Sequence, residues 1–304
     1  MTDAAAYRPL LFSIAYGMTG SVGDAEDLVQ DAFVGLTRAH RAGTTINDLK
    51  AYLTTSVTRL GINHLGSARV RRETYVGEWL PEPVVVSADR PGPAEYVELA
   101  DSLSMAFLVL LEALSPVERA VFMLREAFGW GYPDVAGAVG KSEANCRQIF
   151  ARARKRIAAG RQPADIAPPP ARRAEGDELA RKFFEAADGG DLDALLGMLA
   201  PDVVFHGDGG GKAQAIGKSL TDPQRIARLL IAGFHRIRLL GVSARPAWIN
   251  GRPGAVMYDA EERVASVIEL DMAHGVVQAV HSVSNPDKLD HLGPVSDVAR
   301  LPKK

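Results

Sequence analysis

The stretch that decides the fold of the first half of this chain is residues 132–159, which read YPDVAGAVGKSEANCRQIFARARKRIAA. Its periodicity predicts two amphipathic helices, Tyr132–Val139 and Ser142 to about Ala159, separated by Gly140-Lys141. Ser142 stands where a helix N-cap is expected. A tight glycine-containing turn between two amphipathic helices is typical of a helix-turn-helix unit, which we therefore predict here.

The second of these helices is strongly basic. Residues 141–161 contain seven Lys or Arg residues and one Glu, and Ala144, Ile149, Ala153 and Ile157 are predicted to face inward. Basic side chains in the first half suit base edges in a major groove, and later ones suit phosphates. The alternative is a solvated basic helix without a ligand. The predicted DNA-binding residues are Lys141, Ser142, Asn145, Arg147, Gln148, Arg152, Arg154 and Lys155.

Working back toward the N-terminus, the first seventy residues predict three helices. The second begins near Asp24, and residues 24–31 contain four acidic residues and no basic one. Such a surface repels phosphates and suits a basic protein partner. The third helix, from about Asp48 to His64, is followed by a basic segment that suits an unpaired DNA strand.

Two proline-rich segments divide the chain. Residues 75–93 contain four prolines, which disfavour a regular helix, and 162–173 contain four more. Helical periodicity resumes at Ala94, and Ser115-Pro116-Val117-Glu118 has the pattern of a capping box that starts another helix.

The sequence after the second linker changes character. We predict helices at 177–187, 192–199 and 222–233, and strands at 203–206, 236–244, 255–259, 263–270 and 276–283, with turns at Asn250-Gly251 and His274-Gly275. Helices followed by a meander of strands predict an α+β domain, with helices on one face of a curved antiparallel sheet.

The length and composition of the sequence limit the possible classes of protein. The 304 residues suffice for about two or three domains, and the composition (47% hydrophobic, 24% charged, net charge −2) is that of ordinary globular protein. We recognise no leader and no apolar run of the ~20 residues that cross a bilayer, so we expect a cytoplasmic protein with no membrane partner. A single cysteine, Cys146, offers neither an intrachain disulfide nor a zinc site. We predict no cofactor, metal site or catalytic residue.

Two motifs in the first half resemble a known family. Residues 114–122, 132–136 and 147–154 are similar to region 4 of extracytoplasmic-function RNA polymerase sigma factors, and residues 24–33 resemble their region 2. The resemblance implies that region 4 reads the minus-35 promoter element and contacts the β flap of core RNA polymerase. It also implies that region 2 opens and reads the minus-10 element, while the acidic helix binds the β′ clamp. The implied polymerase-binding residues are Asp24, Glu26, Asp27, Gln30 and Asp31.

The minus-10 side departs from the family pattern. Relatives often carry Asn and Asp where this chain has Arg59 and Asn63, and an arginine is common at the position of Gly66. We therefore predict contact with DNA but no particular minus-10 sequence. The predicted residues are Arg59, Asn63, Arg69, Arg71 and Arg72.

Three further motifs resemble the sigma J-like subfamily, whose C-terminal extension is a SnoaL-like, cone-shaped α+β domain. They lie at 71–83, 208–212 and 285–289. The resemblance implies that the fused domain modulates sigma activity in place of a separate anti-sigma protein. The implied interdomain residues are Trp79, Leu80, Pro81, Glu82 and Pro83 of the linker, Asp208, Gly209, Gly210, Gly211 and Lys212 of the glycine turn, and Asn285, Pro286, Asp287, Lys288 and Leu289.

The glycine turn favours an intramolecular role. It lacks the spacing of a phosphate-binding P-loop, and three consecutive glycines permit close approach by another backbone. We expect the approaching segment to be the 79–83 linker.

Other functions stay open at this point. The domain could be an enzyme using acid and base groups among His206, Asp208, His235, Asp259, Glu269 and His281, or it could bind a small-molecule ligand in an apolar pocket. The first half could be a repressor that binds DNA without polymerase, although its acidic helix argues against that.

The predicted domain organisation follows from these patterns. It comprises region 2 at 1–73, a linker at 74–93, region 4 at 94–161, a second linker at 162–173, the SnoaL-like domain at 174–291, and a tail at 292–304.

Overall fold

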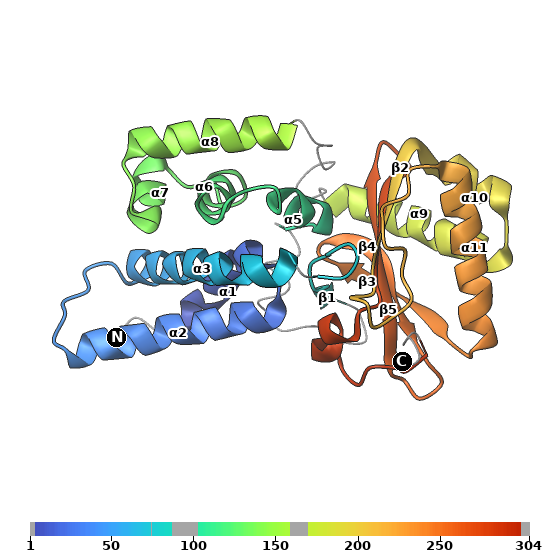
Figure 1. The fold of residues 1–304 in the computed structure, drawn as a ribbon, viewed down its shortest axis with the longest axis horizontal. Helices are drawn as coiled ribbons and strands as arrows, with labels where there is room; N and C mark the ends of the chain where they lie inside the picture. Colours follow the sequence, from blue (N-terminus) through green and yellow to red (C-terminus); the bar gives the residue numbers. More distant parts are fainter. Residues whose placement is uncertain (1–3, 74, 87–102, 159–169, 299–304) are drawn as a thin grey trace. The chain divides into compact units, whose positions relative to one another are not determined.

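The computed structural model describes residues 4–73, 75–86, 103–158 and 170–298, with side chains left undescribed at 68–73, 158 and 170–173 (Figure 1). The chain forms two compact units. The helical unit contains 1–74, 93–103 and 107–162, and the sheet unit contains 75–92, 104–106 and 163–304. The predicted start of a helix at Ala94 and most of the second linker lie outside the described residues.

The N-terminal part of the helical unit is a three-helix bundle behind a short 3-10 turn, Ala4–Tyr7. Its helices are α1 (Arg8–Thr19), α2 (Val22–Arg41) and α3 (Leu49–Glu73). Apolar side chains at helical spacing, including Leu11, Val29 and Leu53, are fully buried between them. These helices confirm the three that the sequence predicts.

Four further helices follow the first linker: α5 (Met105–Leu111), α6 (Pro116–Glu126), α7 (Tyr132–Val139) and α8 (Glu143–Ala158). The predicted capping box is present, because Ser115 and Glu118 each accept a hydrogen bond from the other's backbone N–H, at 3.4 and 3.0 Å. The turn between α7 and α8 has Gly140 at φ 66°, a conformation that glycine adopts without strain. The helix-turn-helix prediction is confirmed.

The sheet unit has one six-stranded sheet with helices on one side (Figure 1). The strand order is β1-β3-β4-β5-β6-β2. Its elements are α9 (Pro170–Gly189), α10 (Leu192–Met198), β2 (Leu199–Asp208), α11 (Pro223–Leu239), β3 (Ser243–Ile249), β4 (Arg252–Tyr258), β5 (Val264–Ala273), β6 (Val276–Val283), and the 3-10 turns Pro286–Lys288 and Asp290–Leu292. The α+β class is confirmed, and the turns at Asn250-Gly251 and His274-Gly275 have the positive φ angles of tight hairpins.

Two sequence-based expectations about this sheet are wrong. Residues 236–239 form the end of α11 and not a strand, because Phe234 and Ile237 continue the helical spacing that buries Leu230. The sheet is also mixed, since β2 pairs parallel to β6 while the remaining pairs are antiparallel. A parallel pair needs a long crossover, which α11 and three strands supply.

The first linker is part of this sheet. Val85–Val86 forms β1, which pairs antiparallel with β3 at the edge of the sheet. Side chains alternate between the two faces of each strand, so Phe205 and Ile268 join the apolar core under the helices while His206 and Glu269 point to the opposite face. The linker segment 75–86 lies on that opposite face (Figure 1).

Among the described residues, no helix combines the length and the hydropathy that crossing a membrane requires.

Candidate functional site

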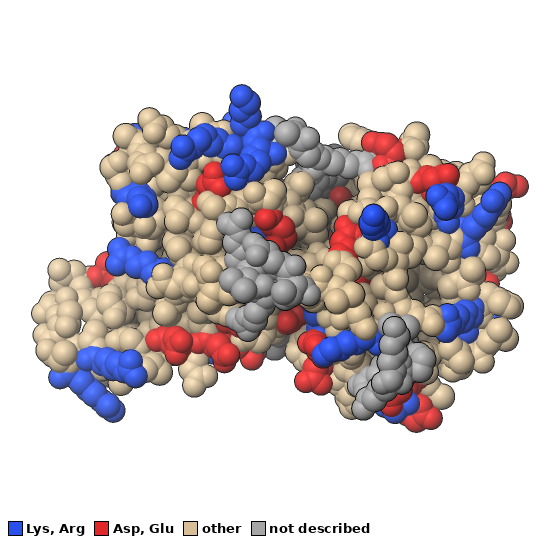
Figure 2. Space-filling model, in the orientation of Figure 1, with Lys and Arg blue, Asp and Glu red and all other residues tan. Residues whose placement is uncertain are grey.

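Helix α8 presents the basic surface that its sequence predicts. Figure 2 shows Lys and Arg side chains gathered over this helix. Arg152, Arg154 and Lys155 are exposed, as are Lys141, Ser142, Arg147 and Gln148, while Asn145 is half-buried. The guanidinium of Arg147 lies 4.9 Å from the ring centre of Tyr132 on α7 and 2.9 Å from the Glu143 carboxylate, so its direction is set by two neighbours.

The inward face of α8 differs from the prediction at one position. Ile149, Ala153 and Ile157 are buried as expected, but Ala144 is exposed and Cys146 takes the inward place. Burial raises the pKa of the Cys146 thiol, so this side chain packs as a neutral apolar group. Cys146 stands three and seven residues before Ile149 and Ala153, so the three side chains share one face of the helix. This spacing in the sequence indicates that Cys146 is buried.

Helix α2 presents the acidic surface. Glu26, Asp27, Gln30 and Asp31 are exposed, and Asp and Glu side chains follow this helix in Figure 2. Asp24 is different, because its carboxylate lies 3.1 Å from Nε2 of His64 on α3. Four of the five predicted polymerase-binding residues therefore form one open face.

Within the helical unit, one predicted DNA-binding residue contacts the helix-turn-helix. Arg59 on α3 donates hydrogen bonds to the carbonyl oxygens of Gly137 and Ala138, at 3.1 and 3.3 Å, where α7 ends. Carbonyls at a helix C-terminus carry partial negative charge and attract such a cation. Asn63 is exposed, and the side chains of Arg69, Arg71 and Arg72 lie outside the described part of the structure.

Arg119 connects the same two regions and was not predicted. This buried side chain of α6 donates to the carbonyl oxygen of Met18 on α1 at 2.7 Å and to that of Leu111 at 3.1 Å. It also pairs with Glu112 at 2.5 Å. A charged residue on the apolar face of a capped helix was the signal in the sequence.

In the sheet unit, the glycine turn binds the linker through Asp208. This carboxylate is fully buried and accepts hydrogen bonds from the Tyr75 hydroxyl at 2.5 Å and the Leu80 backbone N–H at 2.8 Å. Burial and the adjacent carboxylate raise the pKa of the Tyr75 phenol above its usual range. The expected contact between the turn and the linker is therefore present, and it begins earlier, at Tyr75.

Lys288 supplies the charge that balances Asp208. Its ammonium lies 2.6 Å from the Asp208 carboxylate and also donates to the carbonyl oxygen of Leu80. The rings of Trp79 and Tyr75 lie 4.2 and 4.9 Å from it, as in a cation–π cage. We call Tyr75, Leu80, Asp208 and Lys288 the linker latch.

Residues of the 285–289 motif support the latch. Asn285 donates to the Tyr75 hydroxyl at 2.7 Å, and its side chain fills the space beside Gly210, where a Cβ would lie 2.3 Å from it. Leu289 is buried. Pro286 is half-buried at the start of the 3-10 turn. Only a residue without a side chain fits at position 210.

The glycine turn also carries residues that face solvent. Lys212 pairs with Asp287 at 2.5 Å, and both side chains are more than half exposed. Gly209 and Gly211 make close approaches instead, to Ala213 and to Val76 of the linker. The cation that contacts the linker is thus Lys288, and Lys212 lies outside the latch.

The rest of the linker is bound by backbone pairing. Val84 and Asn250 exchange two hydrogen bonds, at 2.9 and 3.0 Å. The ring of His291 lies 2.9 Å from the carbonyl oxygen of Pro83, which is buried like Pro81, while Glu82 is half-buried. The linker thus crosses the sheet. It contacts the end of β2 through Asp208 and pairs with β3, near the opposite edge of the sheet, through β1.

A row of acid and base groups lies beneath the linker, and sequence reasoning did not group them. Glu78 of the linker contacts His206 at 2.6 Å, the rings of His206 and His281 stack at 5.1 Å, and His281 contacts Glu269 at 2.5 Å. Ser219 donates to Glu78 at 2.9 Å. His206, His281 and Glu269 are cross-strand neighbours on β2, β6 and β5, which only the strand register could have predicted.

Burial and neighbouring polar groups shift the pKa values of His281 and Glu78 in opposite directions. Burial lowers the pKa of His281, but the Glu269 carboxylate outweighs burial and the pKa lies above its usual value. Burial raises the pKa of Glu78, but the hydrogen bond from His206 outweighs it and the pKa lies below its usual value. The protonated form of His281 and the ionised form of Glu78 are therefore favoured, and the docked linker covers the row.

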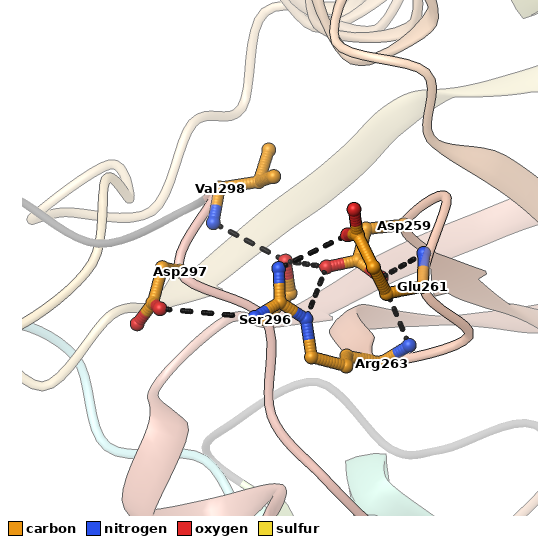
Figure 3. A network of polar contacts seen from close by, with 6 residues as sticks. All are labelled: Asp259, Glu261, Arg263, Ser296, Asp297 and Val298. Carbon is orange, nitrogen blue, oxygen red and sulfur yellow. Dashed lines mark hydrogen bonds and ion pairs between the residues drawn. The ribbon is translucent and has the colours of Figure 1, made fainter.

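The remaining candidates for acid–base chemistry have structural neighbours. Asp259 accepts hydrogen bonds from Arg263 and Ser296, at 2.8 and 2.6 Å (Figure 3). Burial opposes ionisation of Asp259, but these bonds prevail and lower its pKa to about 2. The network attaches residues 294–298 to the start of β5, so they pack with the domain and not as a separate tail. His235 on α11 is exposed beside Arg238.

Comparisons with known proteins cover both halves of the chain. Residues 4–71 match the family model of Sigma-70 region 2, and residues 104–157 match that of Sigma-70, region 4. The chain is 37% identical over 95% of its length to the ECF RNA polymerase sigma factor SigJ of Mycobacterium tuberculosis, covering 92% of that protein. It is 34% identical over 94% of its length to the probable ECF RNA polymerase sigma factor SigI of the same species, covering 93%.

A solved structure agrees with these sequence matches. The crystal structure of Mycobacterium tuberculosis SigJ superposes with a TM-score of 0.75 at 34% identity, covering 94% of this chain and 96% of that one. The similarity therefore includes the sheet unit as well as the two helical regions.

Proposed function

The chain belongs to the extracytoplasmic-function sigma factors of RNA polymerase, and on that premise we propose that its C-terminal domain regulates it by binding the linker between regions 2 and 4. As a member of this family it is a polymerase-dependent, promoter-specific transcription initiation factor and not an enzyme. Its partners are core RNA polymerase and promoter DNA.

We assign the individual surfaces as follows. The exposed acidic face of α2 (Glu26, Asp27, Gln30 and Asp31) suits the β′ clamp, since its charge excludes DNA. The basic face of α8 suits the minus-35 element, with region 4 also contacting the β flap. Arg59 and Asn63 of α3 lie where we expect the minus-10 strand.

The observation that carries the regulatory proposal is the buried latch. An ion pair removed from water is stabilising only when its geometry is good and its other hydrogen bonds are satisfied. Asp208 and Lys288 meet both conditions, and two of the groups that satisfy them, the Leu80 backbone and the Tyr75 hydroxyl, belong to the linker. Release of the linker would leave the pair short of partners, so docking is strongly favoured.

Docking lowers activity in this proposal. A sigma factor must place two regions on two promoter elements at once, and the length of free linker limits that reach. Docking removes residues 75–86 from the connection. In the helical unit, Arg59 and Arg119 hold regions 2 and 4 together, and Arg59 is occupied by α7. The docked chain is thus the less active state.

The test is run-off transcription with purified core polymerase and a promoter panel. The full chain is compared with a chain truncated after Arg161 and with Lys288→Ala, which breaks the latch in the intact protein. We expect promoter-dependent transcripts from the full chain and several-fold more from Lys288→Ala. A chain that binds promoter DNA without core polymerase and yields no transcript would instead be a helix-turn-helix regulator.

A further inference from the structure

A cavity of about 420 Å³ lies in the sheet unit, between α11 and the helix-covered face of the sheet. Apolar side chains such as Phe205, Phe234 and Ile268 form most of its wall. Ligand pockets have volumes of roughly 300–1,000 Å³ and are mostly apolar. The cavity has the dimensions and character of a small-molecule site.

The described lining of the cavity has few polar groups, and the charge among them is positive. Arg236, near the end of α11, is the charged residue among those that line it, and it donates a hydrogen bond to Gln214 on the facing loop. Ser266 of β5 and Ser282 of β6 form part of the floor. None of the described lining residues is acidic. The site therefore suits an apolar body with one anionic group.

The cavity is separate from the acid and base groups of the domain. His206, Glu269 and His281 lie on the other face of the sheet under the linker, whereas Phe205, Ile268 and Ser282, their sequence neighbours, line the cavity. This alternation follows from strand geometry. The described residues that line the cavity offer no general base to a substrate, so the arrangement favours binding over turnover.

We propose that this cavity binds an apolar carboxylic acid, with the hydrocarbon between α11 and the sheet and the carboxylate at Arg236. Its position suits a regulatory ligand, which is the part of the inference that rests on the proposed function. Gly207 lines the cavity and the next residue, Asp208, is in the latch. The Ser284 hydroxyl donates to the carbonyl oxygens of both Asp208 and Gln214, at 3.3 and 3.2 Å. An occupant that orders this wall also orders the latch.

The binding test is calorimetric titration of the full chain with decanoate, 1-decanol and acetate. Decanoate is expected to bind with one-to-one stoichiometry, decanol at least about tenfold more weakly because a charge-assisted hydrogen bond is lost, and acetate not at all. Arg236→Ala should weaken decanoate about tenfold. The matched control is Arg238→Ala, which removes an exposed arginine of the same helical turn that does not line the cavity.

Two filling variants keep the test decisive. Ser266→Phe and Ser282→Phe each place an aromatic ring in the cavity, one from β5 and the other from β6. A variant that unfolds in the same transition as the parent is folded, and at least one such variant should no longer bind decanoate. Absence of decanoate binding to the parent, or decanoate binding that survives in both folded variants, overturns the proposal. Decanol binding as strong as decanoate overturns the role of Arg236.

The coupling has its own readout. Decanoate should slow hydrogen exchange of the Leu80 and Val84 amides, which are bonded to Asp208 and Asn250 in the docked linker. Unchanged exchange at saturating decanoate overturns the coupling. Failure of decanoate to bind leaves the response of transcription to Lys288→Ala intact, so the two proposals fail separately.

Discussion

Helices α8 and α2 of the helical unit and the linker latch of the sheet unit use charge in opposite ways. On α8 and α2 most charged side chains are exposed, and the pair of Arg147 with Glu143 lies at the surface. In the sheet unit, Asp208 and Lys288 are almost fully buried, and their partners belong to the chain itself. Exposed pairs contribute little to stability, whereas breaking a buried pair is costly. The exposed charges of α8 and α2 are therefore available to other molecules, whereas the buried pair of Asp208 and Lys288 binds the chain's own linker.

The largest effect is expected at the buried pair. Asp208→Ala should lower the free energy of unfolding of the sheet unit by about 3–5 kcal/mol, because it leaves the Lys288 ammonium buried without its carboxylate. Chemical denaturation of the full chain measures this. Asp287→Ala, which breaks the exposed pair with Lys212, is the matched control and should change stability by less than about 0.5 kcal/mol. Equal effects would contradict the comparison.

The next effect concerns DNA binding by α8 in the complex with core polymerase. Gln148→Ala should cost about 1–3 kcal/mol at one promoter position and relax the sequence preference there, since we propose that its exposed amide contacts a base edge. Lys155→Ala should weaken binding to all promoters alike. It should also reduce the slope of log affinity against log salt concentration by about 1, because one phosphate contact is lost. Filter binding across a salt series separates the two, and Arg181→Ala on α9 should leave both unchanged.

A smaller effect is expected where the two helical regions meet. Arg59→Ala removes two hydrogen bonds from the carbonyls at the end of α7 and should destabilise the packing of α3 on α7 by about 1 kcal/mol. Hydrogen exchange of the α7 amides should rise accordingly. If Arg59 also contacts the minus-10 strand, promoter opening falls in the same variant. Faster exchange with unchanged opening would restrict Arg59 to the packing role.

The smallest effect is a pH dependence of the stability of the sheet unit. The folded-state pKa of His281 lies above its usual value of ~6.5, so its contribution to stability is fully present below that pH and is lost as the pH rises through the folded pKa. The pKa of Glu78 lies below its usual value, so its contribution is present at neutral pH and is lost in acid. The unfolding free energy, measured across pH, should thus be highest near neutral pH and decline in both acid and alkali. His281→Gln should remove the part of the alkaline decline that begins near neutral pH, leave the part due to the Tyr75 phenol, and leave the acidic decline.

Sequence patterns predicted the helical unit better than the sheet unit. The capping box at Ser115, the turn at Gly140 and the apolar spacing of α8 are local signals that short segments determine. The parallel pairing of β2 with β6, the stacking of His206 on His281 and the position of Lys288 between two rings depend on residues far apart in the chain. No local periodicity encodes such contacts, and the resemblance indicated only which motifs were involved.

The most direct test of the central claim compares Lys288→Ala with Lys212→Ala in run-off transcription on one promoter with the same core polymerase. Both variants remove a lysine cation from the glycine turn or its neighbouring motif, but only Lys288 contacts the linker. The account predicts several-fold more transcript from Lys288→Ala and an unchanged amount from Lys212→Ala. Equal transcript from the two variants and the parent would show that the bound linker does not control this sigma factor.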